Sequence, residues 1–170
     1  KFMPKQDQGV TPNRYAIIPR TLIFLTSGSN ILLLKGAPTK RLWANRYNGI
    51  GGHVEPGEDL LFAAKRELNE EAGVHDVDLW LCGILMVDVE PDRGIGIFIF
   101  RGEVDKTTVE LVPGSEGELA WVSQVSLSNL LLVEDLPVIL PRVLASKRNT
   151  QPFLGRSFYA DGKLKIEFSV

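Results

Sequence analysis

Three glutamates with helical spacing are the residues of this chain best suited to chemistry. Glu67, Glu70 and Glu71 stand at positions i, i+3 and i+4, so on a helix they share one side. Carboxylates at this spacing repel one another. A hard divalent cation such as Mg²⁺ or Mn²⁺ would remove that conflict, because it prefers oxygen ligands and brings compensating charge. The same cation binds phosphate oxygens, so the spacing predicts a metal site that serves a phosphorylated substrate.

The residues around these glutamates fit the same chemistry. Arg66 precedes Glu67 and can hold a carboxylate in one rotamer through a bidentate contact. Upstream, the glycines at positions 49, 51, 52 and 57 let the backbone bend tightly and turn a carbonyl or an N–H group toward a ligand. The glycine-rich loop leads directly into the start of a helix, which is a position suited to anions.

The glutamates require a helix that buries a different face. Apolar residues recur at helical spacing along the segment, at Leu61, Ala64, Leu68 and Ala72. This stripe predicts a helix from Asp59 to Ala72, begun by Glu58 or Asp59 and ended by Gly73. At about 100° per residue, the glutamates lie roughly a right angle away from the stripe. One face can therefore be buried while the adjoining face presents carboxylates to a cleft.

The other elements alternate along the chain without a linker or a repeat. Short apolar runs and turn residues predict a hairpin of strands 21–26 and 31–35, strands at 79–89, 95–104 and 119–122, and a final hairpin at 153–160 and 164–168. A further helix is expected within 127–147, where Pro137 and Pro141 limit its start and its straightness. We expect one mixed α/β domain over residues 15–170, after an irregular lead over residues 1–14.

Composition excludes several classes of protein. The net charge of −2 on 170 residues gives no global field that would recruit nucleic acid or an anionic membrane. Cys82 is the only cysteine, which excludes an internal disulfide and a multi-cysteine zinc site, and it is expected in the core. The apolar runs are too short to span a bilayer and no signal segment opens the chain. A cytoplasmic protein is expected, and monomer and homodimer both remain open.

A glutamate-rich helix face is usually only solvated surface, so the complete pattern matters more than the three glutamates. Its fixed positions are Gly52, Glu58, Arg66, Glu67, Leu68, Glu70, Glu71, Gly73 and Val74. From average residue usage, a chance match in such a chain is on the order of 10⁻⁷. The pattern resembles the Nudix box at every fixed position.

This resemblance implies the α/β Nudix fold, a mixed β-sheet sandwiched between helices. It also implies that Glu67, Glu70 and Glu71, with the Gly52 carbonyl, coordinate the cation. Glu67 or Glu70 could instead be the general base, while Arg66 orients a glutamate and Glu58 braces the loop or the arginine. Many Nudix enzymes place another carboxylate on a later loop; here the candidates are Glu116, which we favour, and Glu118. Water would then attack a phosphoanhydride bond, with no nucleophilic side chain needed.

The substrate is indicated by a second resemblance. The run from Arg46 to Gly52 is similar to MutT-like enzymes that act on oxidised purine nucleotides, in which the aromatic-Asn pair, here Tyr47 and Asn48, lies at the nucleobase. His53 would contact phosphate or base, although relatives of this kind often carry Lys there. The alternative for Tyr47, and for Trp43 nearby, is ordinary loop packing.

Three functions follow in order of preference. The first is hydrolysis of a nucleoside triphosphate, with 8-oxo-dGTP as one candidate, to a monophosphate and pyrophosphate. The second is hydrolysis of ADP-ribose or another nucleotide sugar. The third, from another class, is a nucleotide sensor without catalysis, against which the presence of all three glutamates argues.

Overall fold

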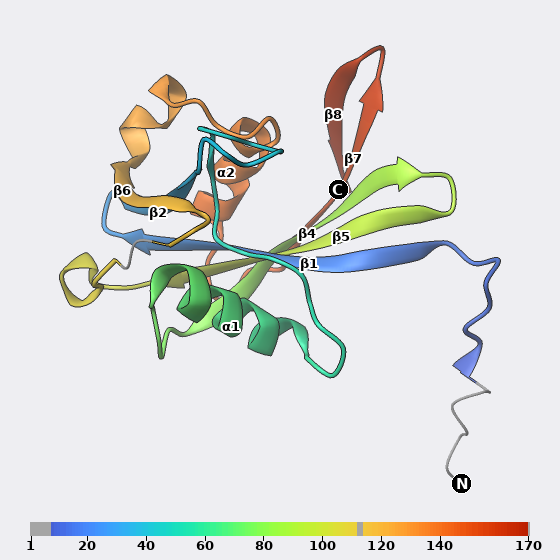
Figure 1. The fold of residues 1–170 in the computed structure, drawn as a ribbon, viewed down its shortest axis with the longest axis horizontal. Coiled ribbons are helices and arrows are strands. Elements are labelled where there is room, and N and C mark those ends of the chain that lie inside the picture. Colours follow the sequence, from blue (N-terminus) through green and yellow to red (C-terminus); the bar gives the residue numbers. More distant parts are fainter. Residues whose placement is uncertain (1–7, 112–113, 170) are drawn as a thin grey trace, which may run out of the picture.

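The molecule is built on a mixed sheet that separates two helices (Figure 1). The computed structural model describes residues 8–111 and 114–169. The strands are β1 (Ala16–Ser27), β2 (Asn30–Gly36), β3 (Tyr47–Asn48), β4 (Leu79–Glu90), β5 (Arg93–Glu103), β6 (Gly117–Ser123), β7 (Phe153–Ala160) and β8 (Lys163–Phe168). The helices that lie wholly within these residues include α1 (Leu60–Ala72), α2 (Leu136–Ala145) and the short 3₁₀ segments η2 (Lys106–Thr108) and η3 (Gln124–Asn129).

The sheet has the strand order β3-β2-β1-β5-β4-β7-β8, and β6 also pairs with β2. β1 runs parallel to β5 and β4 runs parallel to β7, whereas the remaining pairs are antiparallel. The β7–β8 hairpin projects from the body of the molecule (Figure 1).

Strand β1 explains why both faces of the sheet are covered. Leu22 and Phe24 belong to the core cluster that packs against α2. Ile23 and Leu25 belong to the cluster that packs against α1. Successive side chains of a strand point to opposite faces, so a continuous apolar run requires a helix on each side. The predicted mixed sheet sandwiched between helices is therefore confirmed.

The glycine-rich loop is positioned by the divergence of β1 from β2. These strands pair only at Thr26↔Ile31 and Ser27↔Asn30, next to their turn. Beyond the turn, β3 pairs with β2 at Leu34↔Asn48, while the loop after β3 bridges to β1 at Ile23↔Ile50 and Arg20↔His53. The loop thus enters the sheet between two strands that diverge.

Most of the predicted elements are present, with two differences. The helix expected within 127–147 forms only from Leu136, and Pro137 lies in its first turn, where a missing N–H group costs little. β3 was not predicted, because two residues carry no periodic pattern and only their pairing with β2 makes them a strand.

The remaining expectations concern the lead and the cysteine. Residues 8–14 carry turns and no strand or α-helix, whereas residues 1–7 of the predicted lead lie outside the described residues. Cys82 is 2% exposed, as expected for a core residue. Within the described ranges, no helix has the length and apolarity needed to cross a membrane.

Candidate active site

Helix α1 is fixed at both ends and along one face. The Asp59 carboxylate accepts hydrogen bonds from the N–H groups of Leu61 and Phe62, each at 2.9 Å. Gly73 follows the helix with a φ of 65°, a left-handed conformation that favours glycine, and its N–H donates to the Asn69 carbonyl at 2.8 Å. The helix therefore begins and ends where the sequence indicated. Its buried face consists of Ala63, Ala64, Leu68 and Ala72, whereas Leu61 of the predicted stripe is 40% exposed.

The glycine-rich loop is held against β1 and against Glu67. Its carbonyls accept hydrogen bonds from β1, from Ile23 N–H to Ile50 O at 2.6 Å and from Thr21 N–H to Gly52 O at 2.9 Å. A Cβ atom at position 52 would lie 2.4 Å from Glu67 Oε1, closer than any side chain can approach. Glycine at this position therefore lets the loop backbone rest directly on a carboxylate of α1.

Arg66 links the loop to the carboxylates of the helix. Its guanidinium binds both oxygens of Glu58, at 2.6 and 3.0 Å, Glu67 Oε1 at 2.8 Å and Glu70 Oε2 at 3.1 Å. It also donates to the His53 carbonyl at 3.0 Å. Arg66 is the main reason that the pKa of Glu58 falls to about 2. Arg66 thus contacts Glu67 and Glu58, the contacts that an orienting role for Arg66 and a bracing role for Glu58 would require.

A cleft of about 560 Å³ opens beside the loop, and its acidic end holds three glutamates. Glu67 and Glu71 reach it from α1, and Glu116 reaches it from the segment before β6, paired with Lys40. Gly51 N–H donates to Glu71 Oε2 at 3.2 Å. Burial, followed by the charges of Glu67 and Glu116, raises the pKa of Glu71 to about 7.

The donor set at this end suits a hard divalent cation, although the side chains are not gathered into a cage. Among the residues described, no three His, Cys, Asp or Glu side chains are close enough to form a ready metal site. All the available donors are oxygens, and Glu71 is a half-buried carboxylate whose charge is opposed by those of Glu67 and Glu116. The Gly52 carbonyl accepts one hydrogen bond and keeps a second lone pair. Glu70 turns to Arg66, is 58% exposed and does not line the cleft.

The other end of the cleft has an apolar floor and a polar wall. The floor comes from the sheet and includes Leu22, Val87, Ile95 and Ile97. The wall is the segment before α2, where Glu134 accepts a hydrogen bond from Tyr159 Oη at 2.6 Å. Burial raises the pKa of the neighbouring Asp135. The carboxyl groups of Glu134 and Asp135 therefore give this wall polar atoms that can form hydrogen bonds with the edge of a nucleobase.

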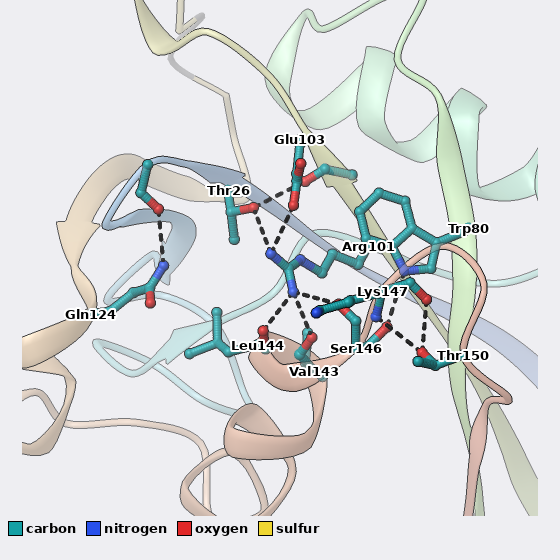
Figure 2. Close-up of polar contacts among 12 residues, drawn as sticks. Thr26, Trp80, Arg101, Glu103, Gln124, Val143, Leu144, Ser146, Lys147 and Thr150 are labelled. Carbon is teal, nitrogen blue, oxygen red and sulfur yellow. Dashed lines mark hydrogen bonds and ion pairs between the residues drawn. The ribbon is translucent and has the colours of Figure 1, made fainter.

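The wall is anchored from both ends of α2. At the far end, the buried Arg101 of β5 donates to the carbonyls of Val143, Leu144 and Ser146 at 3.2, 2.6 and 2.8 Å (Figure 2). At the near end, Arg46 donates to the Leu132 carbonyl at 3.1 Å. These contacts fix the helix, and with it Glu134 and Asp135, over the sheet.

Not every residue predicted for the site lies in the cleft. Asn48, His53 and Gly52 line it. Tyr47 does not: its ring packs against the core on the α2 side. Glu118 lies on β6 and outside the lining, so Glu116 is the later carboxylate that reaches the cleft.

Other lining residues were missed by sequence reasoning. They include Arg20, Lys40, Glu134, Asp135 and Tyr159. Only Glu134 and Asp135 gave a local signal, as an acidic pair just before the proline-containing helix. The other three residues come from segments that are distant in the sequence.

Residues 17–145 match the model of the NUDIX domain, and the chain belongs to this family. The family indicated by residues 52–74 is therefore confirmed, and with it the prediction of a Nudix hydrolase at the level of family and fold.

Two curated relatives are described as oxidized purine nucleoside triphosphate hydrolases. The zebrafish (Danio rerio) protein is 33% identical over 102 residues, 59% of this chain and 57% of its own length. The mouse (Mus musculus) protein is 41% identical over 54 residues, 32% of this chain and 33% of its own length. The matches thus span less than two thirds of each relative.

Solved structures agree on the fold. A MutT protein from Bacillus halodurans superimposes with a TM-score of 0.74 at 23% identity, over 89% of this chain and 97% of that one. The NUDIX domain of Shewanella oneidensis NrtR, solved with ADP ribose, has a TM-score of 0.67 at 12% identity, over 84% of this chain and 98% of that one.

Proposed function

We propose that this protein is a metal-dependent pyrophosphohydrolase that converts a nucleoside triphosphate into a nucleoside monophosphate and pyrophosphate. The observation that carries the proposal is the composition of one cleft, in which Glu67, Glu71 and Glu116 lie beside an apolar floor with a polar wall. Phosphates paired with a cation fit the first part, and a flat base fits the second.

The acidic end supplies the groups for hydrolysis. Glu67, Glu71 and the Gly52 carbonyl would hold Mg²⁺ or Mn²⁺, with Glu116 and a reoriented Glu70 as further ligands. When bound, the cation would neutralise phosphate charge and lower the pKa of the attacking water. Glu67 and Glu70 are the candidates for the general base, and the position of Glu67 in the cleft favours it. Arg66 keeps Glu67 in one rotamer through the contact at 2.8 Å.

The other end would select the base. Asn48 and the carboxyl group of Asp135 offer polar atoms above a floor of aliphatic side chains. The two curated relatives named as oxidized purine nucleoside triphosphate hydrolases favour a purine, with 8-oxo-dGTP as the first candidate. The lone buried Cys82 is compatible with the reducing cytoplasm, where we place the protein as a monomer or a homodimer without a nucleic-acid partner.

A substrate panel tests this proposal. The protein is incubated with Mg²⁺ or Mn²⁺ and 8-oxo-dGTP, each ordinary nucleoside triphosphate, or ADP-ribose, and products are separated by ion-exchange chromatography. We expect a triphosphate to be preferred, monophosphate and pyrophosphate to appear in equal amounts, and EDTA to abolish turnover. A preference for ADP-ribose, the ligand of the NrtR domain, would move the assignment to nucleotide-sugar hydrolysis. Binding without any product would favour a nucleotide sensor.

A further inference from the structure

Arg20 stands at the cleft although no motif of the sequence points to it. It lies on β1 two residues before Leu22, and alternate residues of a strand share a face. Leu22 faces the α2 side of the sheet, where the cleft lies, and Arg20 is part of the lining. The side chain is therefore directed to the same space as the proposed substrate.

The guanidinium of Arg20 lacks partners that the protein would normally provide. Its Nε atom is buried and has no hydrogen-bond partner among the described residues. Within those residues, no carboxylate lies within ion-pair distance of its guanidinium. Buried donors in folded proteins are nearly always hydrogen-bonded, because an unpaired donor loses its interaction with water without compensation. The guanidinium of Arg20, a residue that lines the cleft, is therefore left without a protein partner and can bind a ligand there.

The charges of the lining indicate what that acceptor is. Arg20 and Lys40 are the Arg and Lys side chains of the lining in the described part of the chain, and Lys40 is already paired with Glu116. Arg66 does not line the cleft and is bound to Glu58, Glu67 and Glu70. Arg20 is thus the lining cation that remains available to an anionic ligand.

The position of Arg20 indicates which part of a nucleotide it meets. On one side it pairs in register with Ile97 of the apolar floor. On the other side the backbone of Arg20 bridges to His53 of the glycine-rich loop. The residue before His53 is Gly52, whose backbone lies against Glu67. Arg20 therefore stands between the floor that suits the base and the loop that suits the phosphates.

We propose that Arg20 binds the phosphate group nearest to the nucleoside, as a substrate-binding residue outside the Nudix box. This inference rests on the proposed function, since it takes a nucleoside phosphate as the ligand. A guanidinium suits the role because its planar fork can bind two phosphate oxygens at once and stays charged at every physiological pH.

The test compares ligands that differ by one phosphate. Binding of guanosine and of GMP, and of adenosine and AMP in parallel, is measured by calorimetry in EDTA, so that the protein supplies the positive charge. Wild-type protein is compared with Arg20→Gln and Arg20→Lys. The control is Arg41→Gln, which removes the same charge from an exposed residue that does not line the cleft.

We expect Arg20→Gln to weaken monophosphate binding by about tenfold or more, as for loss of a charged hydrogen bond, and to leave nucleoside binding within twofold. Arg20→Lys should recover part of the loss, and Arg41→Gln should change neither ligand. The melting temperature of each variant shows that it remains folded.

Three results would overturn the inference. One is an equal loss for nucleoside and monophosphate, which would assign Arg20 to the base or to the shape of the cleft. Another is an unchanged monophosphate affinity in Arg20→Gln. The third is a wild-type protein that binds a monophosphate no more tightly than its nucleoside. Because none of these measurements needs turnover, failure of the hydrolase proposal in the substrate panel remains distinguishable from failure of this one.

Discussion

Arg66 and Arg101 each gather several acceptors around one guanidinium, but the acceptors differ in kind. Arg66 binds the carboxylates of Glu58, Glu67 and Glu70, next to the cleft. Arg101 binds three carbonyls at the end of α2, together with Thr26 Oγ1 and the largely exposed Glu103 (Figure 2). Its guanidinium carbon also lies 5.5 Å from the centre of the Trp80 ring.

The two kinds of acceptor indicate two roles for arginine, one beside the cleft and one in stabilising the fold. A helix ends with carbonyls that have no partner within the helix, and a buried cation can satisfy them without any chemical role. A cation that enters the cleft, by contrast, competes with Arg66 for the carboxylates, so a ligand can rearrange the Arg66 network. We therefore expect substitutions around Arg66 to change activity and substitutions around Arg101 to change stability.

The largest effect is expected for Glu71→Gln. The amide can keep the contact from Gly51 N–H but cannot supply the negative charge for a cation. We expect kcat to fall at least about a thousandfold, equivalent to about 4 kcal/mol, as measured with the best triphosphate of the panel. The control is Glu110→Gln, at an exposed glutamate away from the cleft, which should be as active as wild type.

The same variant should be no less stable than wild type without metal. The folded pKa of Glu71, about 7, lies above its usual value of 4.5, so its ionised form opposes folding. The wild type therefore loses stability relative to Glu71→Gln as pH rises from about 4.5 to about 7. Urea unfolding at pH 5 and pH 8 would show this gap, and a variant less stable at pH 8 would contradict it.

Arg101→Met should have the next largest effect, on stability. The substitution keeps an apolar chain near Trp80 but leaves the carbonyls of α2 without their donor, at a cost of about 3 kcal/mol. The free energy of unfolding is measured in urea, and activity per folded molecule should stay within a few fold of wild type. Arg148→Met is a matched control because Arg148 lies 5.3 Å from the same ring but is exposed, so it should cost less than about 0.5 kcal/mol. A thousandfold loss of kcat in Arg101→Met would break the comparison.

Arg66→Lys should affect activity more than stability. Lysine keeps the charge but cannot bind both oxygens of Glu58 and also reach Glu67, so Glu67 loses its fixed rotamer. We expect kcat to fall by about 10–100-fold, the range typical of residues that orient metal ligands. Steady-state kinetics on the best triphosphate is the measurement, with Lys65→Met at an exposed neighbour as control. Wild-type kinetics would show that Arg66 has no part in positioning.

The smallest effect is a pH dependence carried by Glu58. Arg66, followed by the N–H of Glu55, lowers the pKa of Glu58 from 4.5 to about 2. A lowered carboxyl pKa stabilises the fold above pH 4.5, and that stabilisation is lost as pH falls from about 4.5 toward 2. Wild type should therefore be more stable than Glu58→Gln at pH 6, and their unfolding midpoints should converge near pH 2. In an Arg66→Met background most of this difference should vanish, and its persistence would assign the shift to another partner.

Much of the fold could be predicted from local patterns in the sequence. The helix of residues 60–72 was predicted within one residue, because its stripe, its Asp59 cap and its Gly73 end are all local features. Both predicted hairpins formed for the same reason, since each turn carries its own residue signals. β3 escaped prediction because its two residues become a strand only through pairing with β2.

The sequence by itself determined the family and the helix that carries the glutamates, and it indicated that Arg66 contacts a carboxylate. All of these depend on residues close together in the chain, where spacing fixes which side chains can meet. Tertiary structure alone decided which carboxylates reach the cleft: Glu67 and Glu71 do, Glu70 does not, and Glu116 arrives from a distant segment. It also packed Tyr47 against the core and brought Arg20 and Asp135 to the cleft. Such outcomes depend on how the sheet twists and where α2 packs on it, and no local spacing encodes contacts between segments that meet only after folding.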